Sequence, residues 1–257
     1  MANQRPKKQR WHAISWRALL PLGLLALALS LRLAEPSLLT DIRLAVFDQY
    51  QTLKPREKTP VPVQLVDIDE QSLEQLGQWP WPRNQLAKLV DAINDAGAAA
   101  IVIDVLLSEP DRLSPSAVAE MIPDWPEYQS AREAILGRKG HDEQFAQSLA
   151  RANSVLCFAL HDEVVGEMPK PKAGLVQAGD PPDPFLLSFA GGISALPILP
   201  QAVGGYGACR LMPDPGGVVR RAPMLVSVAG IVLPMLDAEA LRVAQAASTY
   251  IVKSTNA

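Results

Sequence analysis

Residues 61–83 constrain the fold of this 257-residue chain more than any other stretch. Residues 63–68 are almost continuously apolar, which is typical of a strand that is buried on both faces of a parallel sheet. The strand ends in two acids, Asp67 and Asp69, and the next residues have the pattern of a short helix that stops at Gly77. The stretch therefore predicts a buried strand whose end carries two carboxylates.

A rigid aromatic turn follows this short helix. Residues 79–83 read Trp-Pro-Trp-Pro-Arg, and the two prolines restrict the backbone on both sides of Trp81. The turn should hold Trp79, Trp81 and Arg83 in a fixed arrangement, with aromatic faces beside a cation. This composition indicates a recognition surface and does not by itself indicate catalysis.

The next elements predict a parallel sheet. Residues 84–96 have the apolar face of a helix, and residues 98–105 are a second buried strand, which contains Asp104. A strand, a helix and a strand in this order favour a right-handed crossover. Ligands of open α/β sheets bind at the carboxyl ends of the strands. We therefore expect the acids of both strands to share one edge, below residues 79–83.

The rest of the chain predicts further helices, a third buried strand and a hairpin. A turn signal at residues 214–217 predicts an antiparallel hairpin, and residues 168–184 are rich in proline and glycine, which predicts a long loop or lid. The expected fold is α/β, a mainly parallel sheet with flanking helices plus an antiparallel hairpin, preceded by one N-terminal transmembrane helix. The other predicted elements are a variable insert at 108–140, helices at 127–136, 141–152 and 233–246, and a strand at 154–160.

An uncharged segment near the N-terminus predicts a membrane anchor. Residues 18–31 carry no charge, and apolar neighbours extend them toward the roughly 20 residues that span a bilayer. Residues 1–34 contain six of the 24 Lys and Arg residues and no acid, so the positive-inside rule places the N-terminus in the cytoplasm. A signal peptide cleaved after residues 26–28 is the alternative, but apolar residues continue past that point, which favours an uncleaved anchor.

These signals define four segments. Residues 1–17 are the expected cytoplasmic basic head, residues 18–34 a single-pass anchor in the cell inner membrane, residues 35–60 a juxtamembrane helix and linker, and residues 61–257 a periplasmic or extracellular domain. The juxtamembrane helix either packs on its own domain or forms a dimer contact or signal-transmitting segment, and we expect a homodimer of the full-length form. Its apolar face consists of Leu39, Ile42, Val46, Tyr50 and Leu53.

Charge and cysteine content narrow the possible partners. Beyond residue 34 the chain carries 18 Lys and Arg against 27 Asp and Glu, and this acidic balance argues against nucleic acid as a partner, because nucleic acid needs a basic face.

The only cysteines, Cys157 and Cys209, fall in predicted strands and are either two buried thiols or a disulfide. The sequence has no CxxC, HExxH or GxSxG motif, so it predicts neither a zinc site nor a serine hydrolase. We expect no cofactor.

Three interpretations compete for the acidic edge. As a ligand site, the acids meet polar or cationic groups, the tryptophans stack and Arg83 binds an anion. As a metal site, the acids bind Mg²⁺ or Ca²⁺. As a structural corner, Asp69 caps the next helix, the tryptophans pack, and Arg83 pairs with Asp67 or Asp104. The candidate residues are Asp67, Asp69, Trp79, Trp81, Arg83, Asp104 and Glu109.

In this order of elements the chain resembles the second class of CHASE domains, the extracytoplasmic sensor modules of bacterial membrane signalling proteins. The resemblance extends from about residue 48 to residue 242 behind the anchor. Its most specific piece is DIDEQSLEQLGQWPWPR, and the collinear pieces are GAAAIVIDVLLSEPD, HDEQFAQSLARAN, DPGGVVRRAPM and PMLDAEALR.

The resemblance implies a non-enzymatic sensor for an unknown small-molecule or protein signal. Such domains are usually followed by membrane helices and an output such as an adenylate or guanylate cyclase or a kinase. Because the sequence ends at Ala257, we expect it to lack the output and part of the sensor. Two alternatives from other classes are an anchored metal-assisted α/β enzyme using Asp67, Asp69 and Asp104, and a structural dimerisation module.

Overall fold

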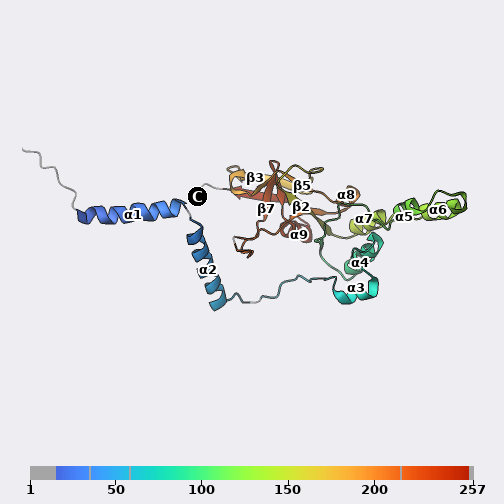
Figure 1. Cartoon of the computed structure of the whole chain (residues 1–257), viewed down its shortest axis with the longest axis horizontal. Coiled ribbons are helices and arrows are strands. Elements are labelled where there is room, and N and C mark those ends of the chain that lie inside the picture. The colour runs from blue at the N-terminus through green and yellow to red at the C-terminus, as the bar shows by residue number, and fades with distance from the viewer. Residues whose placement is uncertain (1–15, 35, 58, 215, 255–257) are drawn as a thin grey trace, which may run out of the picture. The chain divides into compact units, whose positions relative to one another are not determined.

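The computed structural model describes residues 16–34, 36–57, 59–214 and 216–254 and divides the chain into two compact units, residues 1–66 and 67–257 (Figure 1). Most of the expected basic head, residues 1–15, lies outside the described residues. The first unit contains two helices, α1 (Trp16–Ala34) and α2 (Ser37–Leu53).

The helices of the first unit expose their apolar side chains. Every leucine of α1 from Leu20 to Leu33 is exposed, and α2 has no buried residue. Among the described residues, no helix alone has the length and hydropathy of a membrane span. Residues 20–34 and Ser37–Leu53 meet both conditions only as a pair, and the pair is bent by 82°.

The second unit is built around β2 (Ser154–His161), whose first five residues are all buried. Two strands pair with it in parallel, β1 (Ile101–Ile103) and β6 (Gly205–Cys209). The short β5 (Gly191–Ile193) pairs antiparallel with its last three residues. A strand with neighbours on both sides and buried faces needs a continuous apolar sequence, which β2 has. The fold is mixed α/β, as the sequence predicts.

Helices pack against this sheet. Along β2 and β6 the side chains alternate, so Leu156, Phe158 and Tyr206 share one face and belong to the core cluster with α4, α7 and α8. On the opposite face α9 lies against β6, close to Gly205 and Gly207. The bounds of these helices are α4 (Arg83–Asp95), α7 (His141–Arg151), α8 (Ile198–Ala202) and α9 (Leu236–Ala244).

We expect Gly207→Ala to destabilise the second unit by about 1–3 kcal/mol, the cost of overpacking a well-packed contact. A Cβ at this position would lie 2.7 Å from Cα of Leu236 and 2.9 Å from its backbone nitrogen, so the start of α9 would have to move. Gly204→Ala is the matched control, because its Cβ would meet only the carbonyl oxygen of Ser154 at 3.8 Å. Urea unfolding of both variants in mild detergent tests this, and equal stabilities would contradict it.

Two smaller sheets and several short helices complete the second unit (Figure 1). The pairs β3–β9 and β4–β7 are parallel, and β7–β8 is an antiparallel hairpin. The strands are β3 (Gly174–Gly179), β4 (Ser188–Phe189), β7 (Leu225–Val228), β8 (Ile231–Pro234) and β9 (Thr249–Ser254). The helices are α3 (Glu70–Leu76), α5 (Pro115–Met121) and α6 (Gln129–Leu136), with 3₁₀ turns at η1 (Pro126–Tyr128) and η2 (Asp183–Phe185).

A buried ion pair connects α9 to β6 and β9. The side chain of Glu239 is completely buried and accepts hydrogen bonds from Arg242 at 2.7 and 2.9 Å. Its carboxylate also accepts bonds from the Tyr206 backbone N–H at 3.1 Å and from the Tyr250 hydroxyl at 2.7 Å. Burial and the bond to Glu239 raise the pKa of Tyr250. Four hydrogen bonds thus satisfy this buried carboxylate.

The predicted strand at residues 63–68 is wrong. These residues have no strand partner, and Val63 and Leu65 are 77% and 84% exposed. An apolar run becomes a strand only where a neighbouring strand satisfies its backbone groups, and the main sheet pairs β1 with β2 instead. Asp67 and Asp69 therefore do not stand at the end of a strand, and the predicted crossover between residues 63–68 and 98–105 does not form.

The predicted hairpin and loop are also corrected. The hairpin forms at residues 225–234 instead of around residue 214, because Ala229 and Gly230 both have positive φ, as a type I′ turn requires. Residues 214 and 217 do form a turn, closed by a 3.0 Å hydrogen bond, but Pro215 lies outside the described residues. Residues 174–179 of the expected loop form β3, which pairs with β9.

Candidate functional site

The aromatic turn is anchored on one side and open on the other. Trp81 is buried in the core cluster, and its Nε1 donates a 2.7 Å hydrogen bond to the carbonyl oxygen of Gly77. Trp79 packs edge-to-face on Trp81, with ring centroids 6.0 Å apart, and remains half-buried. The helix stop at Gly77 thus fixes Trp81, which in turn orients Trp79.

A pocket of about 190 Å³ opens beside this turn. Trp79, Pro80 and Arg83 form one wall, and residues 105–109, which follow β1, form the other. The two walls come from segments that are more than 20 residues apart in sequence, and the fold brings them together. Of the residues predicted from the sequence, Trp79, Arg83 and Glu109 line the pocket, whereas Asp67, Asp69, Trp81 and Asp104 do not.

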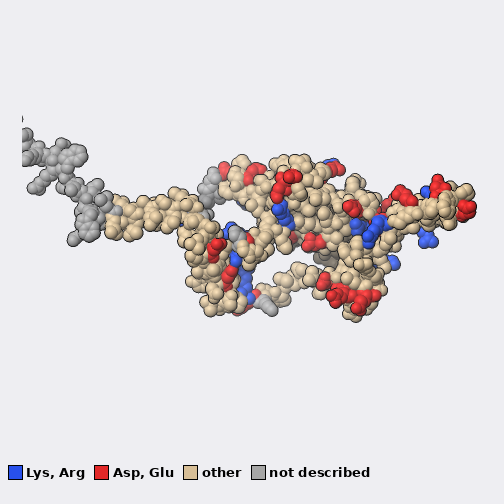
Figure 2. All heavy atoms as spheres, viewed as in Figure 1, with Lys and Arg blue, Asp and Glu red and all other residues tan. Residues whose placement is uncertain are grey.

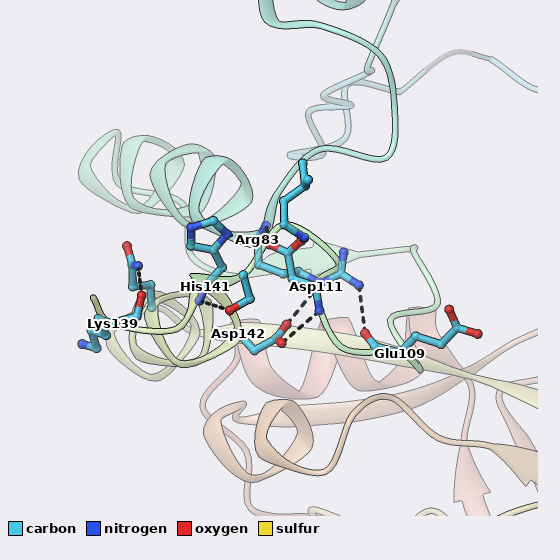
Figure 3. A network of polar contacts seen from close by, with 9 residues as sticks. Arg83, Glu109, Asp111, Lys139, His141 and Asp142 are labelled. Carbon is cyan, nitrogen blue, oxygen red and sulfur yellow. Dashed lines mark hydrogen bonds and ion pairs between the residues drawn. The ribbon is translucent and has the colours of Figure 1, made fainter. Parts of the chain in front are cut away.

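Arg83 lines this pocket and also belongs to a buried polar network, which Figure 3 shows. Only 9% of the residue is exposed. Its guanidinium Nη2 is 3.5 Å from the carbonyl oxygen of Glu109, and its Nε is 3.7 Å from Oδ1 of Asp142. Both Nε and Oδ1 are buried without a hydrogen bond, so part of the donor capacity of Arg83 is unused. The expected partners Asp67 and Asp104 are replaced by Asp142.

The carboxylate of Asp111 organises the network that holds Arg83. Its Oδ2 accepts a 2.7 Å bond from the backbone N–H of Arg83 and lies 2.9 Å from Nδ1 of His141. Its Oδ1 accepts a 2.8 Å bond from the backbone N–H of Leu113, and its own N–H donates to Asp142. Asp111 is 7% exposed, so these contacts are shielded from water.

The turn at residues 111–114 caps two helices at once. Pro82 and Gly140, the N-cap residues of α4 and α7, supply no side-chain cap. Asp111 accepts from the first N–H of α4, and the hydroxyl of Ser114 accepts from the first N–H of α7 at 3.1 Å. Helix N-termini need such acceptors because their first N–H groups have no partner within the helix. This turn belongs to the segment that the sequence marks as a variable insert, yet it joins α4 to α7.

This cluster contains a serine, a histidine and an aspartate, but it is not a hydrolytic triad. Ser114 accepts from the backbone N–H of His141, whereas a nucleophilic serine must donate to a ring nitrogen. Ser114 is also 6% exposed, which keeps its hydroxyl from solvent. The geometry therefore assigns this cluster a structural role.

The predicted acids lie in separate places. Asp69 caps α3, where its Oδ1 accepts bonds from Ser72, and these bonds lower the pKa of Asp69. Asp67 is exposed, and acidic side chains gather over α3 on the face shown in Figure 2. Asp104 instead lies beside Cys157 and Cys209. Among the described residues, Asp67, Asp69, Asp104 and Glu109 do not come together, so the interpretation of the acidic edge as a Mg²⁺ or Ca²⁺ site has no support.

Sequence reasoning missed Asp111, Ser114, His141 and Asp142. The sequence contains one indication of these capping residues, because both α4 and α7 begin after residues that cannot cap a helix by a side chain. Such helices require an acceptor from elsewhere in the fold. The short polar stretch at residues 111–114 is a suitable source of that acceptor.

The geometry describes an α/β domain with an aromatic ring and a buried cation at a small pocket. A comparison with protein families gives the class of this domain. The model of the CHASE2 domain matches residues 22–256, and the chain belongs to this family of extracytoplasmic sensory domains. No curated protein and no solved structure matches the chain.

Proposed function

We propose that this chain is the sensory module of a membrane-bound signal-transduction protein and that its pocket at Trp79, Arg83 and residues 105–109 receives the signal. The sensory role rests on family membership. The assignment of the pocket as the ligand site rests on its wall of aromatic and cationic side chains. A guanidinium group beside a half-buried indole in one pocket wall is suited to binding an anionic group next to a flat apolar one.

The size of the pocket limits the signal molecule. Its volume of about 190 Å³ is below the roughly 300–1,000 Å³ of most small-molecule sites, so it accommodates a compact ligand or one end of a larger one. Arg83 favours a carboxylate or phosphate group, and Trp79 favours a ring or alkyl group against its face. We propose a small carboxylate- or phosphate-bearing molecule.

The proposed topology places the pocket outside the cytoplasm. Its support is the uncharged segment at residues 18–31 behind a basic head, with the acidic balance of the chain beyond it. In this proposal residues 18–34 anchor the chain in the inner membrane, and α2 presents its exposed apolar face, which includes Ile42, Val46 and Tyr50, to a second copy. By resemblance, the output of the full-length protein is a cyclase or a kinase.

Ligand screening with pocket variants tests the proposed site. We expect a compact carboxylate or phosphate to raise the melting temperature of the chain in mild detergent and to change its tryptophan fluorescence. Trp79→Ala removes the aromatic part of one wall, and Ser108→Phe places a large side chain in the opposite wall. Each should weaken binding at least tenfold, or about 1.4 kcal/mol.

Trp125→Ala is the matched control for this screen. Trp125 is 58% exposed and stacks on Tyr128, outside the pocket. It should leave the affinity unchanged. A ligand that binds Trp79→Ala and Ser108→Phe as tightly as the parent chain would show that the signal is received elsewhere.

A further inference from the structure

Three side chains that commonly bind metals converge on the α9-facing side of the main sheet. Asp104 follows β1, Cys157 lies on β2, and Cys209 ends β6. One carboxylate oxygen and the two Sγ atoms all lie within 4.8 Å of one another. Both cysteines are free thiols, and Sγ of Cys209 donates to the carbonyl oxygen of Phe158 at 3.3 Å.

Strand register explains this convergence. Ile103 pairs with Leu156, so Asp104 follows at the level of Cys157. Cys157 pairs with Gly207, and Cys209 pairs with Ala159. Paired residues of adjacent strands point to the same face, and so do residues two apart. The three ligand groups therefore belong to one face of the sheet.

We propose that Asp104, Cys157 and Cys209 form a zinc site with three protein ligands and an open fourth position. Zinc takes thiolate and carboxylate ligands at about 2.0–2.3 Å, so ligand atoms in a tetrahedral site lie roughly 3.3–3.8 Å apart. Atoms within 4.8 Å of one another reach that spacing with a small change of side-chain torsions. Asp104 is exposed and Cys209 is half-buried, so the ion enters from solvent on their side, while Cys157 is buried.

A metal fits this site better than a disulfide does. Cys157 and Cys209 are diagonal neighbours in the sheet, and diagonal Cα atoms lie about 7–8 Å apart, beyond the roughly 4.4–6.8 Å of disulfides. One zinc ion can bind both thiolates without the two Cα atoms coming as close as a disulfide requires. On binding, each thiol loses its proton to solvent, so one Zn²⁺ forms two Zn–S bonds and releases two protons, with no oxidation. The site does not depend on the proposed sensory pocket.

Cobalt and zinc titrations of the whole chain test this proposal. The chain is reduced, treated with a chelator and kept in mild detergent. We expect one Co²⁺ per chain to produce a thiolate-to-cobalt charge-transfer band that Zn²⁺ removes. Zn²⁺ should also protect the half-buried thiol of Cys209 in the parent chain from alkylation, a readout that needs no variant to fold.

Substitutions then test each ligand. Cys209→Ser should abolish the charge-transfer band or weaken Co²⁺ binding at least tenfold, and Asp104→Asn should weaken it about tenfold while preserving the shape of the side chain. Asp95→Asn is the control, because Asp95 is an exposed acid on α4 away from this face. Absence of the band at one Co²⁺ per chain would overturn the proposal, as would unchanged affinity in Cys209→Ser or Asp104→Asn.

Discussion

Replacing Glu239 by alanine is expected to lower the free energy of unfolding by about 3–5 kcal/mol, the range for breaking a buried ion pair from one side. The loss leaves the guanidinium of Arg242 buried without its anion, because this residue is only 9% exposed. It also removes the acceptors of the Tyr206 backbone N–H and the Tyr250 hydroxyl. Three elements, β6, α9 and β9, lose a common contact.

Asp237→Ala is the matched control for this variant. Asp237 lies on the same helix, but it is exposed, and its side chain accepts a 2.8 Å hydrogen bond from the backbone N–H of Ala238. Surface substitutions of this kind usually change stability by less than about 0.5 kcal/mol. Urea unfolding in mild detergent gives both values, and a Glu239→Ala loss no larger than that of Asp237→Ala would show that the ion pair contributes no net stability.

Asp111→Asn should cost about 2–4 kcal/mol, although it preserves the size of the side chain. The carboxylate uses Oδ2 for both the Arg83 N–H and His141, and Oδ1 for the Leu113 N–H. An amide in its place must turn its NH₂ group toward one of these donors, which leaves a buried donor without an acceptor. The variant should also weaken binding at the pocket, because Arg83 begins the helix that Asp111 caps.

Asp124→Asn controls for the general effect of removing a carboxylate. Asp124 pairs with Arg132, but its side chain is 76% exposed, and such pairs contribute about 0–1 kcal/mol. Thermal and urea unfolding should therefore show that Asp111→Asn is clearly less stable than Asp124→Asn. If Asp111→Asn were as stable as Asp124→Asn, the 111–114 turn would not be the connection between α4 and α7 that its contacts indicate.

The sequence predicted the helices and the strand that a local hydrophobic pattern identifies. The helices over 84–96 and 141–152 appear as α4 and α7 because one apolar face specifies an amphipathic helix. The strand over 154–160 appears as β2, because β1 and β6 pair with its apolar run on both sides. The strand predicted at residues 63–68 does not form, because an apolar run does not specify which strand it pairs with. The hairpin was misplaced because Ala229 gives no turn signal, although it adopts positive φ.

The site was predicted in part for a similar reason. Trp79, Arg83 and Glu109 meet at one pocket, because two of them share the proline-rich turn and the third follows β1. The partners of Arg83 come from residues 26 or more positions away, which local patterns do not encode. The sequence did not indicate the proposed zinc site, because its residues lie on or directly after three different strands, more than fifty residues from one another along the chain, so only strand register brings them together.

The most direct test of the central claim, that this domain senses outside the cytoplasm, is the topology of the chain in a bacterial inner membrane. Alkaline phosphatase, which is active only outside the cytoplasm, is fused after residue 60, and a reporter that is active only in the cytoplasm is fused at the same position. The six Lys and Arg residues of the first 34, without an acid, predict an active phosphatase and a silent cytoplasmic reporter. An active cytoplasmic reporter with a silent phosphatase would contradict the account.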